Sequence, residues 1–286
     1  MGNNRPITIG RIDYTNVWPI FHYFDEKRLS GRAEVLSRVP SLLNRALREG
    51  ELDIAAISSF AYAHNAQDYL LMPDLSVSAR GRVNSILLFL KKPLNEVLNG
   101  KIALTDTSAT SVNLLKIIMN RYFQASPQYE TMEPSLDKML EAADAALLIG
   151  DSAIRASWSN TAYEVIDLGE LWHRWTGYGM TFAVIAVRKE AAAQFPDIIA
   201  EIHGQFLASK QRSLQHLAPL VDKASQELGG EPAYWQRYFS ELHYDFGAQE
   251  QAGLDLYFRY AKELGLLDHE VDIQYWSDQS VAQVKE

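Results

Sequence analysis

Several residue types and motifs that indicate particular chemistries are missing from this chain of 286 residues. It contains no cysteine, which excludes disulfides, thiolate nucleophiles, iron–sulfur clusters and cysteine-ligated zinc. No apolar run approaches the ~20 residues that a membrane-spanning helix needs. No HExxH pair, phosphate-binding loop or GxSxG elbow occurs, so the sequence predicts neither a metal nor a cofactor. Residues 1–6 lack the apolar stretch of a secretory signal, and we expect a cytoplasmic protein.

The sequence also has fewer basic residues than acidic ones. The chain has 27 lysines and arginines against 36 aspartates and glutamates, which gives a net charge of −9. A general nucleic-acid binder needs a basic surface, so the charge argues against that class of protein. An anionic ligand would meet a repulsive overall field, and its site must attract it locally.

Short apolar runs alternate with amphipathic stretches over the first part of the chain. Residues 7–12, 33–39 and 52–57 have the pattern of strands, and residues 41–48 have the spacing of a helix. This alternation is typical of βαβ units and a mostly parallel sheet. A second α/β series begins after a strand expected at residues 83–90 and includes a helix over 110–123.

The last third of the chain has only helical patterns, including residues 196–217 and 247–264. Helices alone cannot form a third α/β domain, so we expect them to pack back onto the first one. The predicted fold is α/β with two lobes. Residues 1–88 plus 186–286 form a discontinuous lobe I, and residues 89–185 form lobe II. A ligand in such a fold is expected in the cleft between the lobes, at carboxyl ends of strands and N-termini of helices.

Small polar residues follow several of the expected strands. One such junction is more often a helix cap than a binding site, but several of them in two lobes could line one cleft. The segment 108–111 places hydroxyls at a helix start, which suits either a plain cap or a carboxylate or phosphate site. Arg80, Arg82 and His173 could also contact an anion, although surface or packing roles are more common for such residues. The polar residues at the junctions include Asn16, Ser58, Ser59, Ser85, Ser108, Thr110, Ser111 and Asp151.

At these same junctions the sequence resembles the menaquinone-biosynthesis family of periplasmic-binding-protein-like enzymes, and within it the chorismate dehydratases of the futalosine route. The matching stretches follow the family order over about residues 7–188. Thr176-Gly177 is followed by Tyr178-Gly179-Met180, where the family usually has Leu-Pro. The stretches are YTNVWP at 14–19, VPSLLN at 39–44, GELD at 50–53, ISS at 57–59, GRVNS at 81–85, SATS at 108–111, LIGDSA at 148–153, DLGELW at 167–172 and TG at 176–177.

The resemblance implies a two-lobed type II binding-protein fold, with a ligand cleft between the lobes and a helical C-terminal region. It also implies elimination of water from chorismate, a small dicarboxylate, to give 3-[(1-carboxyvinyl)oxy]benzoate. Aromatisation of the ring drives this reaction, so no redox cofactor is needed. A sister enzyme of the family, 1,4-dihydroxy-6-naphthoate synthase, shares the fold and is kept as an alternative.

The matched cleft residues are mostly poor bases, so we expect the substrate's own enolpyruvyl carboxylate to take the ring proton. Asn16 and Ser85 are predicted to be catalytic, by hydrogen-bonding the carboxylates or the leaving hydroxyl. The other residues are predicted to bind substrate. Ser108, Thr110 and Ser111 hold a carboxylate, Ser59 adds a contact, Gly150 and Asp151 begin a helix at the cleft, and Thr176 and Gly177 close it.

Two alternatives from other classes fit the same architecture. A solute-binding protein that feeds a transporter has two lobes, but it works outside the membrane and needs a secretory signal. A cytoplasmic sensor of a small carboxylate needs an output domain, and no helix-turn-helix is evident. Either protein would bind its ligand without turnover. We expect no nucleic-acid or membrane partner, and the sequence does not indicate an oligomeric state.

Overall fold

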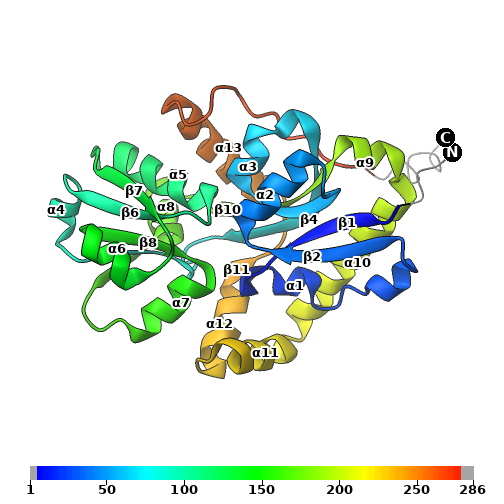
Figure 1. The fold of residues 1–286 in the computed structure, drawn as a ribbon, viewed down its shortest axis with the longest axis horizontal. Helices are drawn as coiled ribbons and strands as arrows, with labels where there is room; N and C mark the ends of the chain where they lie inside the picture. The colour runs from blue at the N-terminus through cyan, green and yellow to red at the C-terminus, as the bar shows by residue number, and fades with distance from the viewer. Residues whose placement is uncertain (1–4, 278–286) are drawn as a thin grey trace.

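Two β-sheets, each with helices on its faces, build the protein, and the computed structural model describes residues 5–277 (Figure 1). The first sheet has six strands in the order β11-β4-β10-β3-β1-β2. The second has five, in the order β7-β6-β8-β5-β9. The strands are β1 (Ile7–Ile12), β2 (Ala33–Arg38), β3 (Ile54–Ser58), β4 (Tyr69–Ala79), β5 (Ile86–Leu90), β6 (Lys101–Thr105), β7 (Gln128–Met132), β8 (Ala145–Ile149), β9 (Glu164–Asp167), β10 (Met180–Arg188) and β11 (Leu242–His243).

The chain passes between the sheets twice. It enters the second sheet between β4 and β5, and it returns to the first after β9 as β10. β1 is parallel to β2 and β3, whereas β10 is antiparallel to β3 and β4. In the second sheet β6 is parallel to β7 and β8, and β5 is antiparallel to β8 and β9. The predicted two-lobed α/β fold is therefore confirmed, while the exact lobe limits at residues 88 and 186 stay a prediction.

Helices cover both sheets and connect them. The shorter helical turns are η1 (Thr15–Val17), η2 (Glu26–Leu29), η3 (Ala66–Asp68) and a π-helix, η4 (Ile118–Tyr122). The α-helices are α1 (Trp18–Phe21), α2 (Pro40–Glu49), α3 (Ser59–His64), α4 (Leu94–Val97), α5 (Ala109–Ile117), α6 (Leu136–Ala142), α7 (Gly150–Ser159), α8 (Leu168–Thr176), α9 (Lys189–Gln194), α10 (Pro196–Gln215), α11 (Ala218–Leu228), α12 (Pro232–Glu241) and α13 (Ala248–Glu263).

The expected C-terminal helices are present as α10 and α13, and they pack back onto the first sheet. The prediction that this region is wholly helical is wrong. Leu242 and His243 form β11 against β4, and Tyr275 bridges to Leu71. An open edge of a sheet exposes unpaired N–H and C=O groups. β11 and Tyr275 cover the edge that β4 would otherwise leave open. A strand of two residues has no periodicity that a sequence could show.

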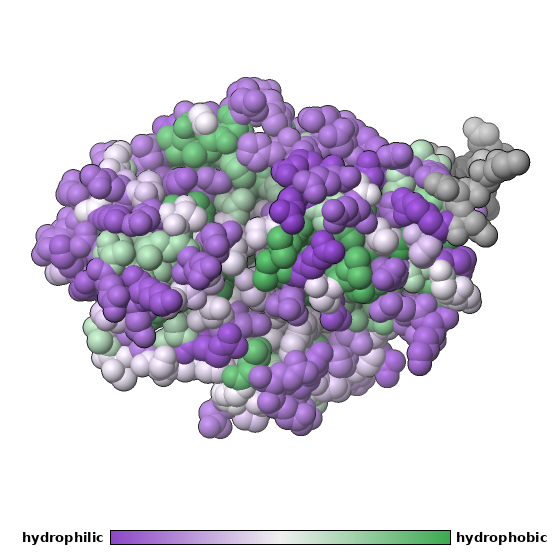
Figure 2. Space-filling model, in the orientation of Figure 1, coloured by the Kyte–Doolittle hydropathy of each residue, from purple (hydrophilic) through white to green (hydrophobic). Residues whose placement is uncertain are grey.

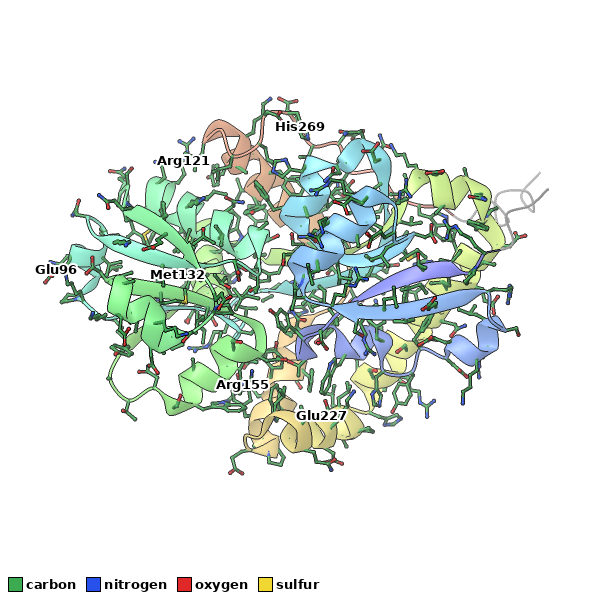
Figure 3. The ribbon with its side chains drawn as sticks, in the orientation of Figure 1. Glu96, Arg121, Met132, Arg155, Glu227 and His269 are labelled. Carbon is green, nitrogen blue, oxygen red and sulfur yellow. The ribbon has the colours of Figure 1, made fainter. Side chains whose placement is uncertain are left out.

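The C-terminal helices also join the two sheets. Figure 1 shows α13 on one side of the junction and α12 on the other. Arg121, at the end of the α5–η4 segment, pairs with Glu263 of α13 at 2.7 Å, and Figure 3 shows Arg121 beside this helix. The Tyr257 hydroxyl of α13 donates to the Thr110 carbonyl of α5 at 3.1 Å. Elements from the end of the chain therefore hold the two lobes in one arrangement.

The viewed face of the molecule is mostly hydrophilic, with hydrophobic residues in smaller areas between (Figure 2). Over residues 5–277, no helix has both the length and the apolar character that crossing a membrane requires. The hydrophobic core lies within and between the layers, where strand residues such as Ile9, Ile54 and Val187 are fully buried.

A buried carboxylate fixes the start of β3 against β1. The Asp53 side chain is 1% exposed, and it accepts hydrogen bonds from Arg5 Nη1 and Nη2 at 2.6 and 2.7 Å. The backbone N–H of Thr8 donates to the same carboxylate at 2.9 Å. Burial alone raises the pKa of Asp53, but the hydrogen bonds from Arg5 and Thr8 outweigh it, so the pKa is lowered.

We expect Asp53→Asn to lower the free energy of unfolding by about 2 kcal/mol at neutral pH, because an amide turns an N–H₂ group toward donors that need an acceptor. A carboxyl with a lowered pKa contributes stability above its unfolded pKa of 3.8, and this contribution is lost as the pH falls through the folded value. The difference from wild type should therefore shrink below about pH 4. Urea unfolding at pH 7 and pH 3 measures it, with the exposed Asp222→Asn as control. Equal stability of the Asp53 variant and wild type at pH 7 contradicts this account.

Candidate functional site

A pocket lies between the two sheets, where strands of both end. The unfilled space between its walls is about 500 Å³, part of it open to solvent. Segments after β1, β2, β6 and β8 contribute to the lining, together with the end of β3 and the turn before β5. None of the described residues that line it carries a charge. Its polar side chains are Tyr14, Asn16, Ser58, Ser85, Ser108 and Ser111.

The remaining walls of the pocket are apolar. Side chains from both sheets supply them, so a ligand held here is covered from two sides. Apolar walls with a few hydroxyl and amide groups suit a molecule with a flat hydrocarbon body and polar substituents. The apolar lining residues are Ile12, Pro40, Val77, Val83, Ile86, Ile149, Phe182, Ala183 and Leu242.

Helix N-termini converge on this pocket. Pro40 begins α2, Ser108 is the N-cap of α5, and Gly150 begins α7. The N-terminus of a helix carries a partial positive charge and backbone N–H groups without intrahelical partners. Several such termini together favour an anion without any basic side chain. This arrangement supplies the local attraction that a chain of net charge −9 needs.

Five of the ten predicted site residues line the pocket: Asn16, Ser85, Ser108, Ser111 and Gly150. Among the described residues, Asn16 Oδ1 is buried and has no hydrogen-bond partner. Buried polar atoms are nearly always paired in folded proteins, so this acceptor points to a ligand group. Ser108 Oγ accepts a hydrogen bond from the Ser111 backbone N–H at 3.3 Å. Ser108 therefore caps α5 and lines the pocket at the same time.

The other five predicted residues do not line the pocket. Ser59 Oγ donates to the Thr181 carbonyl at 2.8 Å, and Thr110 Oγ1 accepts from the Phe60 N–H at 2.9 Å. Their hydroxyls thus hold neighbouring elements together. Thr176 Oγ1 donates to the Trp172 carbonyl at 2.8 Å within α8, and Gly177 ends that helix at φ +76°.

The fifth of these residues, Asp151, lies in the first turn of α7 behind the lining. It accepts a hydrogen bond of 2.6 Å from Thr15 Oγ1, which links the segment after β8 to the segment after β1. Burial raises the pKa of the Asp151 carboxyl, and the hydrogen bonds from Thr15 oppose this rise.

Arg80, Arg82 and His173 also lie outside the lining. Arg80 Nη2 pairs with Glu250 at 2.5 Å, and Arg82 Nη1 is 3.4 Å from Glu170. His173 Nδ1 is 3.1 Å from the Tyr178 carbonyl. Residues 178–180 form the loop in which the sequence departs from the family. Side chains of α8 contact this loop, and its Gly179 carbonyl accepts a hydrogen bond from Trp172 Nε1 at 3.2 Å.

Two tyrosines at the site are not among the residues predicted from the sequence. Tyr14 stands against the start of α7, so that a Cβ on Gly150 would lie 3.1 Å from its ring. Burial raises the pKa of Tyr14, while a hydrogen bond with Thr107 lowers it. The buried Tyr238, from α12, donates to Ser85 Oγ at 3.2 Å. A tyrosine in a C-terminal helix looks like core packing in the sequence, and only the tertiary fold brings it to the pocket.

A buried carboxylate shapes the turn that carries Ser85. The N-cap of α8, Asp167, accepts from the backbone N–H of Val83 at 3.1 Å, of Asn84 at 2.7 Å and of Glu170 at 3.0 Å. Asn84 takes a left-handed conformation, with φ +59°. The strand expected to begin at residue 83 therefore begins at Ile86, because these N–H groups bond a side chain instead of a neighbouring strand.

The fold and the pocket together define a binding-protein-like class of molecule. The alkanesulfonate-binding protein SsuA of Xanthomonas axonopodis matches with a TM-score of 0.71 at 14% identity, over 95% of this chain and 96% of that one. A solved protein of Archaeoglobus fulgidus matches with a TM-score of 0.70 at 18% identity, over 93% of this chain and all of that one (100%). At these identities the likeness shows the periplasmic-binding-protein fold alone.

Within this class, the chain belongs to the menaquinone-biosynthesis family, whose sequence profile matches residues 7–263. It is 34% identical to the chorismate dehydratase of Thermus thermophilus over 277 residues, covering 92% of this chain and 96% of that one. It is 23% identical to the 1,4-dihydroxy-6-naphtoate synthase of the same organism over 226 residues, covering 78% and 81%. The family resemblance seen in the sequence is confirmed.

We expect Asp167→Asn to lower the free energy of unfolding by about 2–3 kcal/mol and to displace Ser85, because an amide cannot accept all three N–H bonds. Urea unfolding measures the stability. The exposed Asp197→Asn, in the first turn of α10, is the matched control and should stay within about 0.5 kcal/mol of wild type. If both variants are as stable as wild type, the carboxylate does not hold this turn.

Proposed function

We propose that this protein is a chorismate dehydratase, a hydro-lyase that removes water from chorismate and gives 3-[(1-carboxyvinyl)oxy]benzoate. The observation that carries the proposal is the 34% identity to a chorismate dehydratase over nearly the whole of both chains. The pocket supports it, because apolar walls suit the substrate's ring and converging helix N-termini suit its carboxylates. We further propose that it works in the cytoplasm, with a small dicarboxylate as its partner and without a cofactor.

The reaction removes a proton from the ring carbon that bears the enol ether, and hydroxide leaves from the neighbouring carbon. Aromatisation makes the elimination favourable, so the protein must provide a base, a proton for the hydroxide and a fixed geometry. No Asp, Glu, His or Lys is among the described residues of the lining. This composition supports a mechanism in which the enolpyruvyl carboxylate of the substrate takes the ring proton itself.

In this mechanism Asn16 and Ser85 touch the reacting groups. The Asn16 amide has an acceptor for a substrate hydroxyl in its free Oδ1 and donors for a carboxylate in its Nδ2. Ser85 Oγ, in the turn before β5 of the second sheet, hydrogen-bonds the leaving hydroxyl. Ser108 and Ser111 hold a carboxylate at the start of α5, where the helix dipole adds to their hydrogen bonds.

Incubation of the pure protein with chorismate tests the proposed activity. We expect a product lighter by one water, about 18 Da, with the ultraviolet absorbance of an aromatic ring, since the elimination aromatises the substrate. Mass spectrometry and absorbance follow it, and heat-inactivated protein is the control. Tight binding of chorismate without turnover would instead identify a carrier or a sensor.

Substitutions test the two residues proposed to contact the reacting groups. Asn16→Ala and Ser85→Ala should each lower kcat by more than about 10-fold, which corresponds to about 1.4 kcal/mol on the barrier. The matched controls are Asn95→Ala and Ser240→Ala, two exposed positions away from the pocket, and both should turn over at the wild-type rate. Wild-type rates in the Asn16 and Ser85 variants remove these residues from the mechanism.

A further inference from the structure

A groove walled by three helices adjoins the pocket. α2 and α3 form one side of it and α5 the other, and Figure 1 shows α5 on one side of the junction between the lobes and α2 and α3 on the other. The unfilled space between its walls is about 1500 Å³, which includes open solvent. Ser108 lines both the groove and the pocket. Asn44 of the groove and Ser58 of the pocket are joined by hydrogen bonds of 3.2 and 3.3 Å, so the two spaces share a wall.

The helices that wall the groove lead away from the pocket. α2 contributes positions 41, 44, 45 and 48 to the groove, and α5 contributes positions 109, 112, 113 and 116. Positions with this spacing lie on one face of a helix. Pro40 and Ser108, at the starts of the two helices, line the pocket. At a rise of 1.5 Å per residue, Arg45 lies about 8 Å along its helix from that start, and Arg48 and Lys116 lie about 12 Å along theirs.

The groove carries basic side chains, whereas the described lining of the pocket has none. Arg45 and Arg48 contribute from the first lobe and Lys116 from the second. The arginine side chains are 58% and 57% exposed, so a ligand in the groove can reach them. Among residues 5–277 Lys116 forms no ion pair, and its Nζ lies 5.7 Å from the centre of the Tyr129 ring.

The acidic groups around the groove do not cancel these charges. Asp106 is the carboxylate among the described lining residues. Glu49 lies 3.9 Å from Arg45 and from Arg48. Burial lowers the pKa of His64, which also lines the groove, so its imidazole is mostly neutral at pH 7. Three cations against two carboxylates leave the groove positive in a chain whose net charge is −9.

We infer that this groove is the route by which the dianionic substrate enters the pocket, and that Arg45, Arg48 and Lys116 attract it there. The inference rests on the proposed dehydratase function. A cleft lined by charge of one sign concentrates ligands of the opposite sign and speeds their association. The cations stay outside the pocket, so they act on the approach and affinity of the dianion and not on the chemical step.

Helix stability offers a different reason for two of these residues. Arg48 and Lys116 lie in the last turns of α2 and α5, where a cation interacts favourably with the helix dipole. Arg45 lies in the middle of α2, and yet it shares the groove with them. A role in stability alone changes unfolding and leaves KM as it is, whereas attraction of the substrate raises affinity and depends on salt.

Arg45→Glu combined with Lys116→Glu reverses one cation in each lobe and leaves the pocket lining unchanged. At about 0.01 M salt, where charges act over about 30 Å, kcat/KM for chorismate should fall at least about 10-fold. The fall should appear in KM, with kcat within about 2-fold of wild type, because substrate and transition state carry the same charge. At about 1 M salt the difference in kcat/KM should be less than about 2-fold. A wild-type kcat/KM at low salt, or a loss that persists at 1 M, overturns the inference.

The matched control is Lys27→Glu combined with Lys138→Glu, which makes the same change in net charge at one exposed position in each lobe. Lys138 lies on α6, which packs on the face of the second sheet opposite to α5. Its kcat/KM should stay within about 2-fold of wild type. Arg45→Lys combined with Lys116→Arg keeps both charges and should also stay within about 2-fold. An equal loss in the control, or a 10-fold loss in the variant that keeps the charges, overturns the inference.

Binding without turnover separates this inference from the proposed function. Titration calorimetry uses the proposed product, which keeps both carboxylates and is not consumed, and chorismate itself if the wild type does not turn it over. The dissociation constant should rise at least about 10-fold at low salt in the variant with both charges reversed. This rise in a protein without turnover contradicts the dehydratase function alone. Turnover with a kcat/KM that is insensitive to the groove charges contradicts the entry route alone, and absence of both binding and turnover contradicts both.

Discussion

The structure depends on how a protein of net charge −9 accommodates an anion in a pocket whose described lining has no charged side chain. The solution is topological. Strands of both sheets end at the same place, so the helices that follow them begin there and turn their N-termini toward one another. Peptide dipoles do not titrate and add nothing to the net charge, and they act most strongly where water is excluded. The acidic surface is therefore no obstacle to binding a dicarboxylate.

The same topology explains why buried carboxylates lie around the pocket but not in it. Asp167 ties down the turn before Ser85 by accepting backbone N–H bonds, and Asp151 accepts a hydrogen bond from Thr15 in the segment after β1. A carboxylate in the lining would repel an anionic ligand. A carboxylate behind the lining can instead fix the positions of the neutral groups that contact the ligand. This division leaves the described lining without a side-chain base, as the proposed elimination assisted by the substrate requires.

The sequence reveals the residues whose role is local. Asn16, Ser108 and Gly150 can be predicted because short polar residues or glycine after an apolar run mark a strand end, and strand ends in such a fold meet at the cleft. Ser85 precedes β5, and its prediction depends on the family resemblance of residues 81–85. It does not separate Ser108 from Thr110, since both are hydroxyls at one helix start and only packing decides that Thr110 faces Phe60. The position of Tyr238 beside Ser85 and the pairing of β11 with β4 depend on contacts between distant segments, and no local sequence pattern predicts them.

The cross-lobe contacts also fix the position of a residue that lines the pocket. Thr15 follows β1 and Asp151 follows β8, so their hydrogen bond joins the two sheets. Any separation of the lobes breaks this contact. Tyr238 of α12 donates to Ser85 Oγ at 3.2 Å, so this helix contacts the pocket lining. The helix that contributes Tyr238 also anchors the turn of Ser85, since Glu241 of α12 accepts from Asn84 Nδ2 at 2.5 Å. The segments that join the two lobes therefore also fix the position of Ser85 in the pocket.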